Sequence, residues 1–447
     1  MSAPEFTVEI FQNEYLPAGA REVDAVVTVT STSSAAHGPA ATWGAAGAAE
    51  IIIVDSSGSM GAPTEKMTEA RRGAAAAIDA IRDGVAFAVV AGTHQAKQMY
   101  PDEGLTIADA VTRKAAHRAL KRLYPDGGTA IGQWLILARE LFETGDQALR
   151  HVILLTDGQN QHESAEQLAA PINQCEGYFT CDCRGVGTDW VVDELRRIST
   201  ALLGTVDIVP DPAGLAADFE AMMNASMAKE MANVALRVWT PQHATVRFIK
   251  QVAPAVEDLT ARRTQAAPLA GDYPTGAWGA ESRDYHIGVN VEPAAVGQEM
   301  LAARVSLIGT TASGPQTLAQ GLVRAFWTDD EALSTQINRH VAHYTGQAEL
   351  AHVIQDGLEA RKEGDEDTAA AKLGRAIVLA HESGNQDTAN LLAKVVDVID
   401  PVTGTVRLKA KVDDADEMAL DTRSSKTVRV KKEPGGSNGH PTGGARD

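Results

Sequence analysis

The feature that most constrains the fold is an alternation, between residues 50 and 215, of short apolar runs with segments of helical periodicity. The apolar runs include EIIIVD, VAFAVVAG and HVILLTDG, and helices are expected near 66–83, 109–123, 130–143, 163–173 and 190–202. Continuous apolar runs that alternate with helices are typical of a parallel sheet with both faces covered. The sequence therefore predicts an α/β domain with a Rossmann-like, doubly wound parallel sheet over residues 48–215.

Strand-like runs flank this α/β domain on both sides. Two such runs lie within residues 1–31 and five within 234–328. Two strands alone are at best marginally stable in water, so we expect the N-terminal pair to complete an antiparallel β-sandwich with the later strands. The α/β domain would then be inserted in the sandwich. A linker of small and polar residues would precede it, and a helix near 214–233 would follow it.

The C-terminal region predicts a helical module and a tail. Residues 329–400 show 3.6-residue apolar spacing with interruptions at GDED and SGNQD, which indicates at least three helices. The spacing loosely resembles a tetratricopeptide hairpin, but no clear repeat has a fixed period, so an ordinary helical bundle is favoured. Residues 408–447 are polar, with acidic DDADE before basic TRSSKTVRVKK, and predict a disordered tail.

Net charge and hydropathy limit the classes of partner. The 447 residues include 40 Lys and Arg against 59 Asp and Glu, a formal charge of −19 that would repel nucleic acid or an anionic membrane. No stretch approaches the roughly 18 apolar residues of a membrane helix. Glu5 and Glu9 stand where a signal peptide would be apolar. We therefore expect a cytoplasmic protein with no nucleic-acid partner and no membrane span.

Oxygen-bearing side chains follow three of the α/β segments. IIIVDSSGSM places Asp55, Ser57 and Ser59 directly after an apolar run, Thr129 follows GG before a helix, and Asp157 follows ILLT. Ligands of open parallel sheets bind at the carboxyl ends of the strands. Two carboxylates and three hydroxyls, without His or Cys, are typical of a hard cation, Mg²⁺ first and Mn²⁺ or Ca²⁺ next. The ion would keep an open position for an Asp or Glu of a protein partner.

At these five positions the sequence resembles the von Willebrand factor A (VWA) domain family, whose metal-ion-dependent adhesion site uses the same motif in three loops. DSSGS, GGT and TDG occur in that order within residues 48–215. The resemblance implies that Ser57, Ser59 and Thr129 coordinate the metal directly in one state or another. It also implies that at least one of Asp55 and Asp157 acts through water. A degenerate site that binds no metal is the alternative.

Outside residues 48–215 the layout looks like that of intracellular VWA proteins from Ala-rich, actinobacterial-type proteomes. Some of those proteins are associated with Ser/Thr kinases, phosphatases and phosphothreonine-binding proteins. This resemblance implies a non-catalytic adaptor or scaffold in phosphorylation-linked signalling or stress response. The alternative is a regulatory subunit of a MoxR-like or chelatase-like AAA+ machine, a role that other VWA proteins play.

Enzymatic activity is not expected from the motifs. DSSGS superficially suggests a serine nucleophile, but the histidines of the α/β domain stand in no nucleophile–base pattern. The α/β segment also has no G-x-S-x-G elbow and no Walker loop. We therefore expect a protein that binds rather than catalyses.

The cysteines allow two interpretations. Cys181 and Cys183 stand two residues apart and could form a zinc site with Cys175 and His162. The spacing is not that of a zinc finger or ribbon, so buried free thiols are favoured. Three cysteines are also too few for a disulfide framework, which agrees with a reducing compartment.

Two threonines in the basic tail segment are candidate phosphorylation sites. Thr422 and Thr427 lie in DTRSSKTVRVKK, which we expect to be exposed to a kinase. A phosphate there would add charge for an Arg-bearing reader domain. The alternative is a solubilising tail in which the threonines are incidental.

Overall fold

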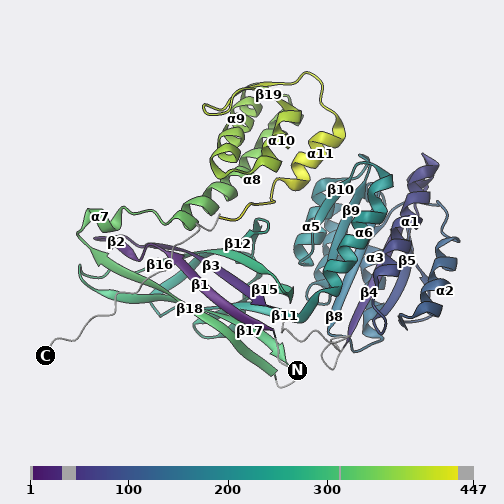
Figure 1. The fold of residues 1–447 in the computed structure, drawn as a ribbon, viewed down its shortest axis with the longest axis horizontal. Coiled ribbons are helices and arrows are strands. Elements are labelled where there is room, and N and C mark those ends of the chain that lie inside the picture. The colour runs from purple at the N-terminus through teal and green to yellow at the C-terminus, as the bar shows by residue number, and fades with distance from the viewer. Residues whose placement is uncertain (1–3, 33–46, 312–313, 431–447) are drawn as a thin grey trace.

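A computed structural model describes residues 4–32, 47–311 and 314–430. It contains an α/β domain, a β-sandwich and a C-terminal helical module (Figure 1). Most of the expected linker before the α/β domain lies outside the described residues.

The α/β domain is built on a sheet in the order β10-β9-β8-β4-β5-β6, with β7 also paired to β5. The five strands from β10 to β5 are parallel, and only β6 and β7 run antiparallel to β5. The strands are β4 (Ala48–Asp55), β5 (Ala86–Gly92), β6 (Ala96–Tyr100), β7 (Thr106–Ile107), β8 (Leu149–Thr156), β9 (Thr180–Val186) and β10 (Val206–Val209). The predicted Rossmann-like parallel sheet is therefore confirmed.

Helices cover both faces of this sheet, which explains why its central strands are apolar throughout. Ile52 and Val54 of β4 pack on one side, and Ile51 and Ile53 pack on the other. Burying each such side chain contributes roughly 1.5–3 kcal/mol. One face is covered by α1 (Thr64–Ala80), α2 (Ala110–Leu120) and α6 (Leu215–Met227), and the other by α3 (Ile131–Glu143), α4 (Ala165–Cys175) and α5 (Val192–Ala201).

The sandwich combines strands from before and after the α/β domain in two sheets, β1-β3-β16-β12-β13 and β14-β15-β11-β17-β18-β2. The N-terminal strand β3 lies between β1 and β16, so the α/β domain is inserted between β3 and β11. The bounds are β1 (Glu5–Gln12), β2 (Tyr15–Pro17), β3 (Glu22–Thr32), β11 (Lys229–Trp239), β12 (Ala244–Ala253), β13 (Glu257–Asp258), β14 (Thr264–Ala267), β15 (Ala270–Gly279), β16 (Ser282–Val291), β17 (Glu299–Thr311) and β18 (Gly314–Thr328).

The helix expected near 214–233 ends earlier, at Met227. Lys229 already begins β11, whose side chains from Val234 onward alternate between buried and partly exposed positions. Alternation with a period of two places one face of a strand on the core, and this packing outweighs the helix propensity of KEMANVA. The strand therefore follows the last helix of the α/β domain after a single residue.

The C-terminal module consists of α7 (Glu331–Ser334), α8 (Arg339–Glu363), α9 (Glu366–Ser383), α10 (Gln386–Val395), β19 (Val396–Asp400), β20 (Thr405–Leu408) and α11 (Asp414–Arg423). Gly364 and Gly384, both with positive φ, end α8 and α9 at the interruptions seen in the sequence. The sequence predicted helix for residues 396–400, and this was wrong. The β-branched run VVDVID instead forms a hairpin strand that pairs with β20.

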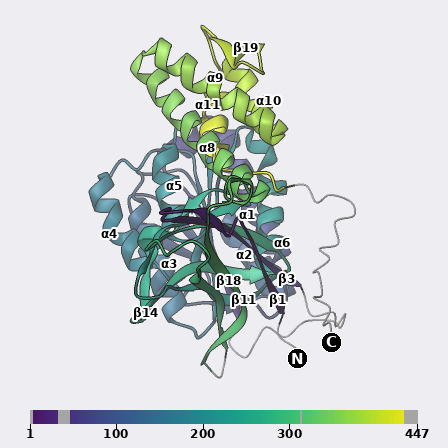
Figure 2. The same cartoon turned by 90° about the vertical axis from the view of Figure 1, so that its left-hand side faces the viewer.

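The disorder expected for residues 408–447 is wrong for 408–430, and the remainder lies outside the described residues. Helix α11 lies beside α5 and β10 of the α/β domain (Figures 1 and 2). Arg423 Nε and Lys426 Nζ lie 2.8 and 2.6 Å from the two carboxylate oxygens of Asp207. Opposite charges that suggested a solvated tail instead form ion pairs with the α/β domain.

We expect Asp207→Asn to loosen this C-terminal segment. The substitution leaves Arg423 and Lys426 without their shared carboxylate, which should lower the free energy of unfolding by about 1 kcal/mol because both cations are partly exposed. Hydrogen exchange of residues 414–430 should rise in this variant. The control is Asp397→Asn, which removes an exposed pair with Arg407 and should change little. Equal protection of residues 414–430 in both variants would contradict this account.

Candidate metal centre

The five predicted ligands meet at the carboxyl edge of the parallel sheet. Asp55 ends β4, Ser57 and Ser59 lie in the turn that follows, Thr129 precedes α3 and Asp157 directly follows β8. Ser57 Oγ and Ser59 Oγ are 2.9 Å apart, and Ser59 Oγ donates to Asp157 Oδ1 at 2.7 Å. A Cβ atom placed on Gly158 would lie 3.2 Å from Ser59 Oγ and 3.9 Å from Thr129 Oγ1. The glycine thus lies against two of the three hydroxyls without filling the space beside them.

Asp55 is fixed and fully buried at the base of the site. Ser57 N donates to its Oδ1 atom at 2.7 Å, and Thr156 Oγ1 donates to its Oδ2 atom at 2.6 Å. Burial raises the pKa of Asp55 to about 6, and the hydrogen bonds from Ser57 and Thr156 only partly offset this. A cation bound beside this carboxylate would favour its charged form.

The two loops that carry Asp55 and Thr129 are joined through their backbones. Gly58 N donates to Gly127 O at 2.9 Å, and Asp126 N donates to Ser56 O at 2.8 Å. Gly127 has a φ of +69°, a conformation that favours glycine. Gly127 therefore has a structural role, because a side chain there would strain the turn that lies beside the first loop.

Two histidines border these glycines at the exposed rim of the site. Ideal Cβ atoms on Gly127 and Gly128 would lie 2.5 Å from His94 Nδ1 and 1.9 Å from His162 Cε1. The two imidazole rings are 5.8 Å apart. A partner that approached the hydroxyls would therefore pass these two side chains.

Sequence reasoning missed two residues that control the charges of the site. Thr156 is the polar residue that ends the apolar run ILLT. Its position was only a weak indication that it donates a hydrogen bond to Asp55. Lys66, in the first turn of α1, has its Nζ atom 2.7 Å from Asp157 Oδ2 and 3.3 Å from Asp189 Oδ2. Burial would lower the pKa of Lys66, but its interactions with these carboxylates raise it. No motif spacing distinguishes this lysine from others in the chain.

The donor set fits a hard divalent cation. The five side chains present only oxygen atoms, and two of them are carboxylates. Mg²⁺, Mn²⁺ and Ca²⁺ prefer such ligands, whereas zinc prefers nitrogen and sulfur. The arrangement can therefore hold a cation between the carboxylates and the exposed hydroxyl of Ser59.

The cysteines lie elsewhere, as free and buried thiols. Cys181 and Cys183 have their sulfur atoms 3.8 Å apart, and Cys175 Sγ donates to Leu135 O at 3.4 Å. Burial raises the pKa of Cys175 to about 12. His162, the fourth ligand of the zinc alternative, is exposed at the rim of the site. The packing favours the interpretation as core thiols.

The tail threonines are not exposed as expected. Thr422 is 2% exposed within α11. Thr427 is partly buried, and its Oγ1 atom donates to Val252 O at 2.6 Å. Docking of the C-terminal segment therefore covers the two threonine hydroxyls that a kinase would need to reach.

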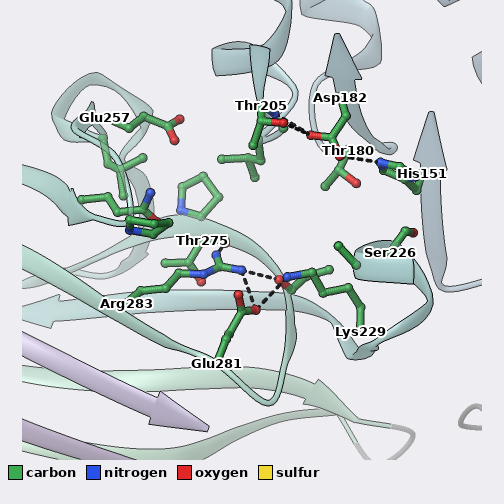
Figure 3. A pocket seen from close by; sticks show the side chains of 18 residues that line it. His151, Thr180, Asp182, Thr205, Ser226, Lys229, Glu257, Thr275, Glu281 and Arg283 are labelled. Carbon is green, nitrogen blue, oxygen red and sulfur yellow. Dashed lines mark hydrogen bonds and ion pairs between the residues drawn. The ribbon is translucent and has the colours of Figure 1, made fainter. Parts of the chain in front are cut away.

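A second polar cluster lines a cavity of about 230 Å³ between the α/β domain and the sandwich (Figure 3). It lies at the amino ends of the parallel strands, opposite the metal-site edge. His151 Nδ1 is 2.7 Å from Glu50 and its Nε2 is 3.0 Å from Asp182. On the sandwich side, Glu281 accepts from Lys229 and Arg283. Charged groups of both units thus meet at this joint.

We expect the α/β domain to lose stability at alkaline pH through His151, whose charged partners Glu50 and Asp182 lie in the same domain. Burial would lower its pKa, but the charges of Glu50 and Asp182 raise it to about 10. Because this lies above the unfolded value of about 6.5, the stabilisation is complete below that value and is lost as pH rises through about 10. The unfolding temperature should fall over this range, and the fall should be smaller in His151→Gln. His117→Gln, a partly exposed control, should behave as wild type; identical pH profiles in all three proteins would refute the assignment.

Comparisons with known proteins agree on one family. A model of the von Willebrand factor type A domain matches residues 49–208, and a model of the von Willebrand factor type A C-terminal domain matches residues 378–424. A solved structure, von Willebrand factor type A from Catenulispora acidiphila, is 53% identical with a TM-score of 0.90. The match covers 96% of this chain and 98% of that chain.

Two other matches are more distant. The ArnB paralog VWA2 from Sulfolobus acidocaldarius has a TM-score of 0.58 at 13% identity, over 95% of this chain and 98% of that one, and shows the fold alone. An uncharacterised protein of Synechocystis is 27% identical over 221 residues, which are 48% of this chain. The chain spans about half the length of that curated relative.

Proposed function

The chain belongs to the von Willebrand factor type A family, and we propose that it is a non-catalytic protein that uses Mg²⁺ to bind an acidic side chain of a protein partner. The observation that carries this proposal is the meeting of Asp55, Ser57, Ser59, Thr129 and Asp157 at one sheet edge. Domains of this family commonly bind a divalent metal and mediate protein interactions. Mn²⁺ or Ca²⁺ is the alternative ion.

The roles of the side chains follow from their burial. Asp55 and Asp157 are fully buried and would supply the negative charge, while Ser57, Ser59 and Thr129 would supply neutral oxygens. Ser59 is exposed, so a cation beside it would be accessible to a partner's carboxylate. Ser57 and Ser59 are hydrogen bonded to each other, and Ser59 donates to Asp157 rather than to an imidazole, which supports binding over nucleophilic catalysis.

The cellular role that we propose is an adaptor or scaffold in bacterial phosphorylation-linked signalling or stress response, in the cytoplasm. Its partner would be a Ser/Thr kinase, a phosphatase or a phosphothreonine-binding protein. This part rests on the resemblance to intracellular VWA proteins of actinobacterial type, and the covered threonines of the C-terminal segment add no support. No described helix is both long and apolar enough to span a membrane.

Affinity capture from native lysate tests the proposal. Wild type would be compared in Mg²⁺ and in EDTA with Asp157→Ala in Mg²⁺, and retained proteins identified by mass spectrometry. We expect a partner that is lost in EDTA and in Asp157→Ala, because both remove the bridge between the metal and the acidic side chain. Asp397→Ala, an exposed carboxylate of the β19–β20 hairpin, should retain the partner.

The outcome of the capture also separates the cellular roles. A kinase, phosphatase or phosphothreonine-binding protein would support the signalling role, whereas an AAA+ ATPase would favour a regulatory subunit of such a machine. Retention of the same proteins in all four samples would show that binding does not depend on the metal centre, and the proposal would fail.

A further inference from the structure

We propose that Lys66 is an internal cation of the metal centre, which weakens binding of the metal alone and strengthens binding of a carboxylate to the metal-loaded site. This inference rests on the proposed function. The observation that supports it is an ion pair between Lys66, whose side chain is 9% exposed, and Asp157, which is fully buried. Asp157 is one of the two predicted carboxylate ligands. A buried ammonium paired with it reduces the net negative charge of the site to which a divalent ion would bind.

The position of Lys66 is set by the fold around it. Its residue lies in the first turn of α1, whose Ala70 and Ala74 are buried against the sheet. A Cβ atom placed on Gly187 would lie 3.9 Å from Lys66 Cε, so the side chain runs beside this glycine. Asp189 then holds Nζ from the solvent side at 3.3 Å. The ammonium is thus fixed between a buried ligand and an exposed carboxylate.

The charges of the buried groups give the direction of the effect. Asp55 and Asp157 carry two negative charges, and Lys66 reduces this to a net single negative charge. A divalent ion then makes the centre positive by one, and a partner's carboxylate makes it neutral. Without Lys66, the metal alone would neutralise the centre, and the carboxylate would add an unbalanced negative charge. Lys66 therefore favours the complex of metal and carboxylate over the complex with metal alone.

The size of the effect depends on screening. Lys66 and Asp157 are both shielded from water, so salt and solvent screen their charges less than those of a surface pair. Even with the dielectric constant of water, the repulsion between the ammonium and a divalent cation a few ångströms away corresponds to roughly a 10-fold to 100-fold loss of metal affinity. An effect of this size is measurable by direct titration.

The test is the affinity of the full chain for Mn²⁺, measured by calorimetry with and without excess acetate as a carboxylate probe. Lys66→Gln, which keeps a hydrogen-bond donor without the charge, should bind Mn²⁺ alone roughly 10-fold to 100-fold more tightly than wild type. Acetate should strengthen Mn²⁺ binding more in wild type than in Lys66→Gln. Lys66→Arg, which keeps the charge, should resemble wild type.

A matched control is Lys114→Gln, which removes one positive charge from an exposed position on α2. This variant should bind Mn²⁺ as wild type does, because solvent screens its charge. If Lys66→Gln binds Mn²⁺ no more tightly than wild type and Lys114→Gln, this inference is overturned and the proposed function stands. If no variant and no wild-type protein binds Mn²⁺, both fail.

Loss of Lys66 also leaves Asp157 buried without its counter-ion, which should destabilise the metal-free protein. The unfolding temperature of Lys66→Gln should therefore be lower than that of wild type without metal and should rise more on addition of Mn²⁺. If Lys66→Gln folds only with Mn²⁺, the internal cation is supported, because the metal then replaces the missing charge. If Mn²⁺ does not restore the stability of this variant, the inference is overturned.

Discussion

Two buried carboxylates, Asp55 and Asp157, are the constraint on which the candidate site depends. They stand at the ends of adjacent parallel strands, and both are fully shielded from solvent. Such charges are costly unless hydrogen bonds or cations compensate them. Thr156, Ser57 and Ser59 supply hydrogen bonds, and Lys66 supplies one positive charge. A divalent cation together with one carboxylate of a partner would balance the single negative charge that remains.

The sandwich and the C-terminal segment contact the α/β domain away from the carboxyl edge of its sheet. That edge, which carries the candidate site, therefore stays accessible. The sandwich joins the α/β domain at the amino ends of the strands (Figure 3). Near this joint, His151 links Glu50 and Asp182 within the α/β domain. The C-terminal segment binds at β10 through Asp207. Ion pairs cross the joint at β10, so the docking of the C-terminal segment depends on charge as well as on apolar packing.

Much of the α/β domain could be predicted because its sequence is locally unambiguous. Strands such as β4 are apolar throughout only if both faces are covered, and the five ligands stand directly at the ends of these elements. The hairpin β19–β20 and helix α11 were missed because their composition is compatible with helix or disorder. Their structure comes from tertiary contacts, such as the burial of Leu420 and the ion pairs of Asp207, which no local pattern encodes. Lys66 was missed for the same reason, since its carboxylate is 91 residues away.

In the proposed complex, the oxygen ligands hold a divalent cation with a position open to a carboxylate. Water-proton relaxation of the Mn²⁺-loaded protein tests this directly, because it reports exchangeable water on the bound ion. We expect one Mn²⁺ site with enhanced relaxation that acetate reduces by displacing water, and loss of the site in Asp55→Asn. An unchanged relaxation rate on adding the protein to Mn²⁺, or an enhancement that survives Asp55→Asn, would contradict the account.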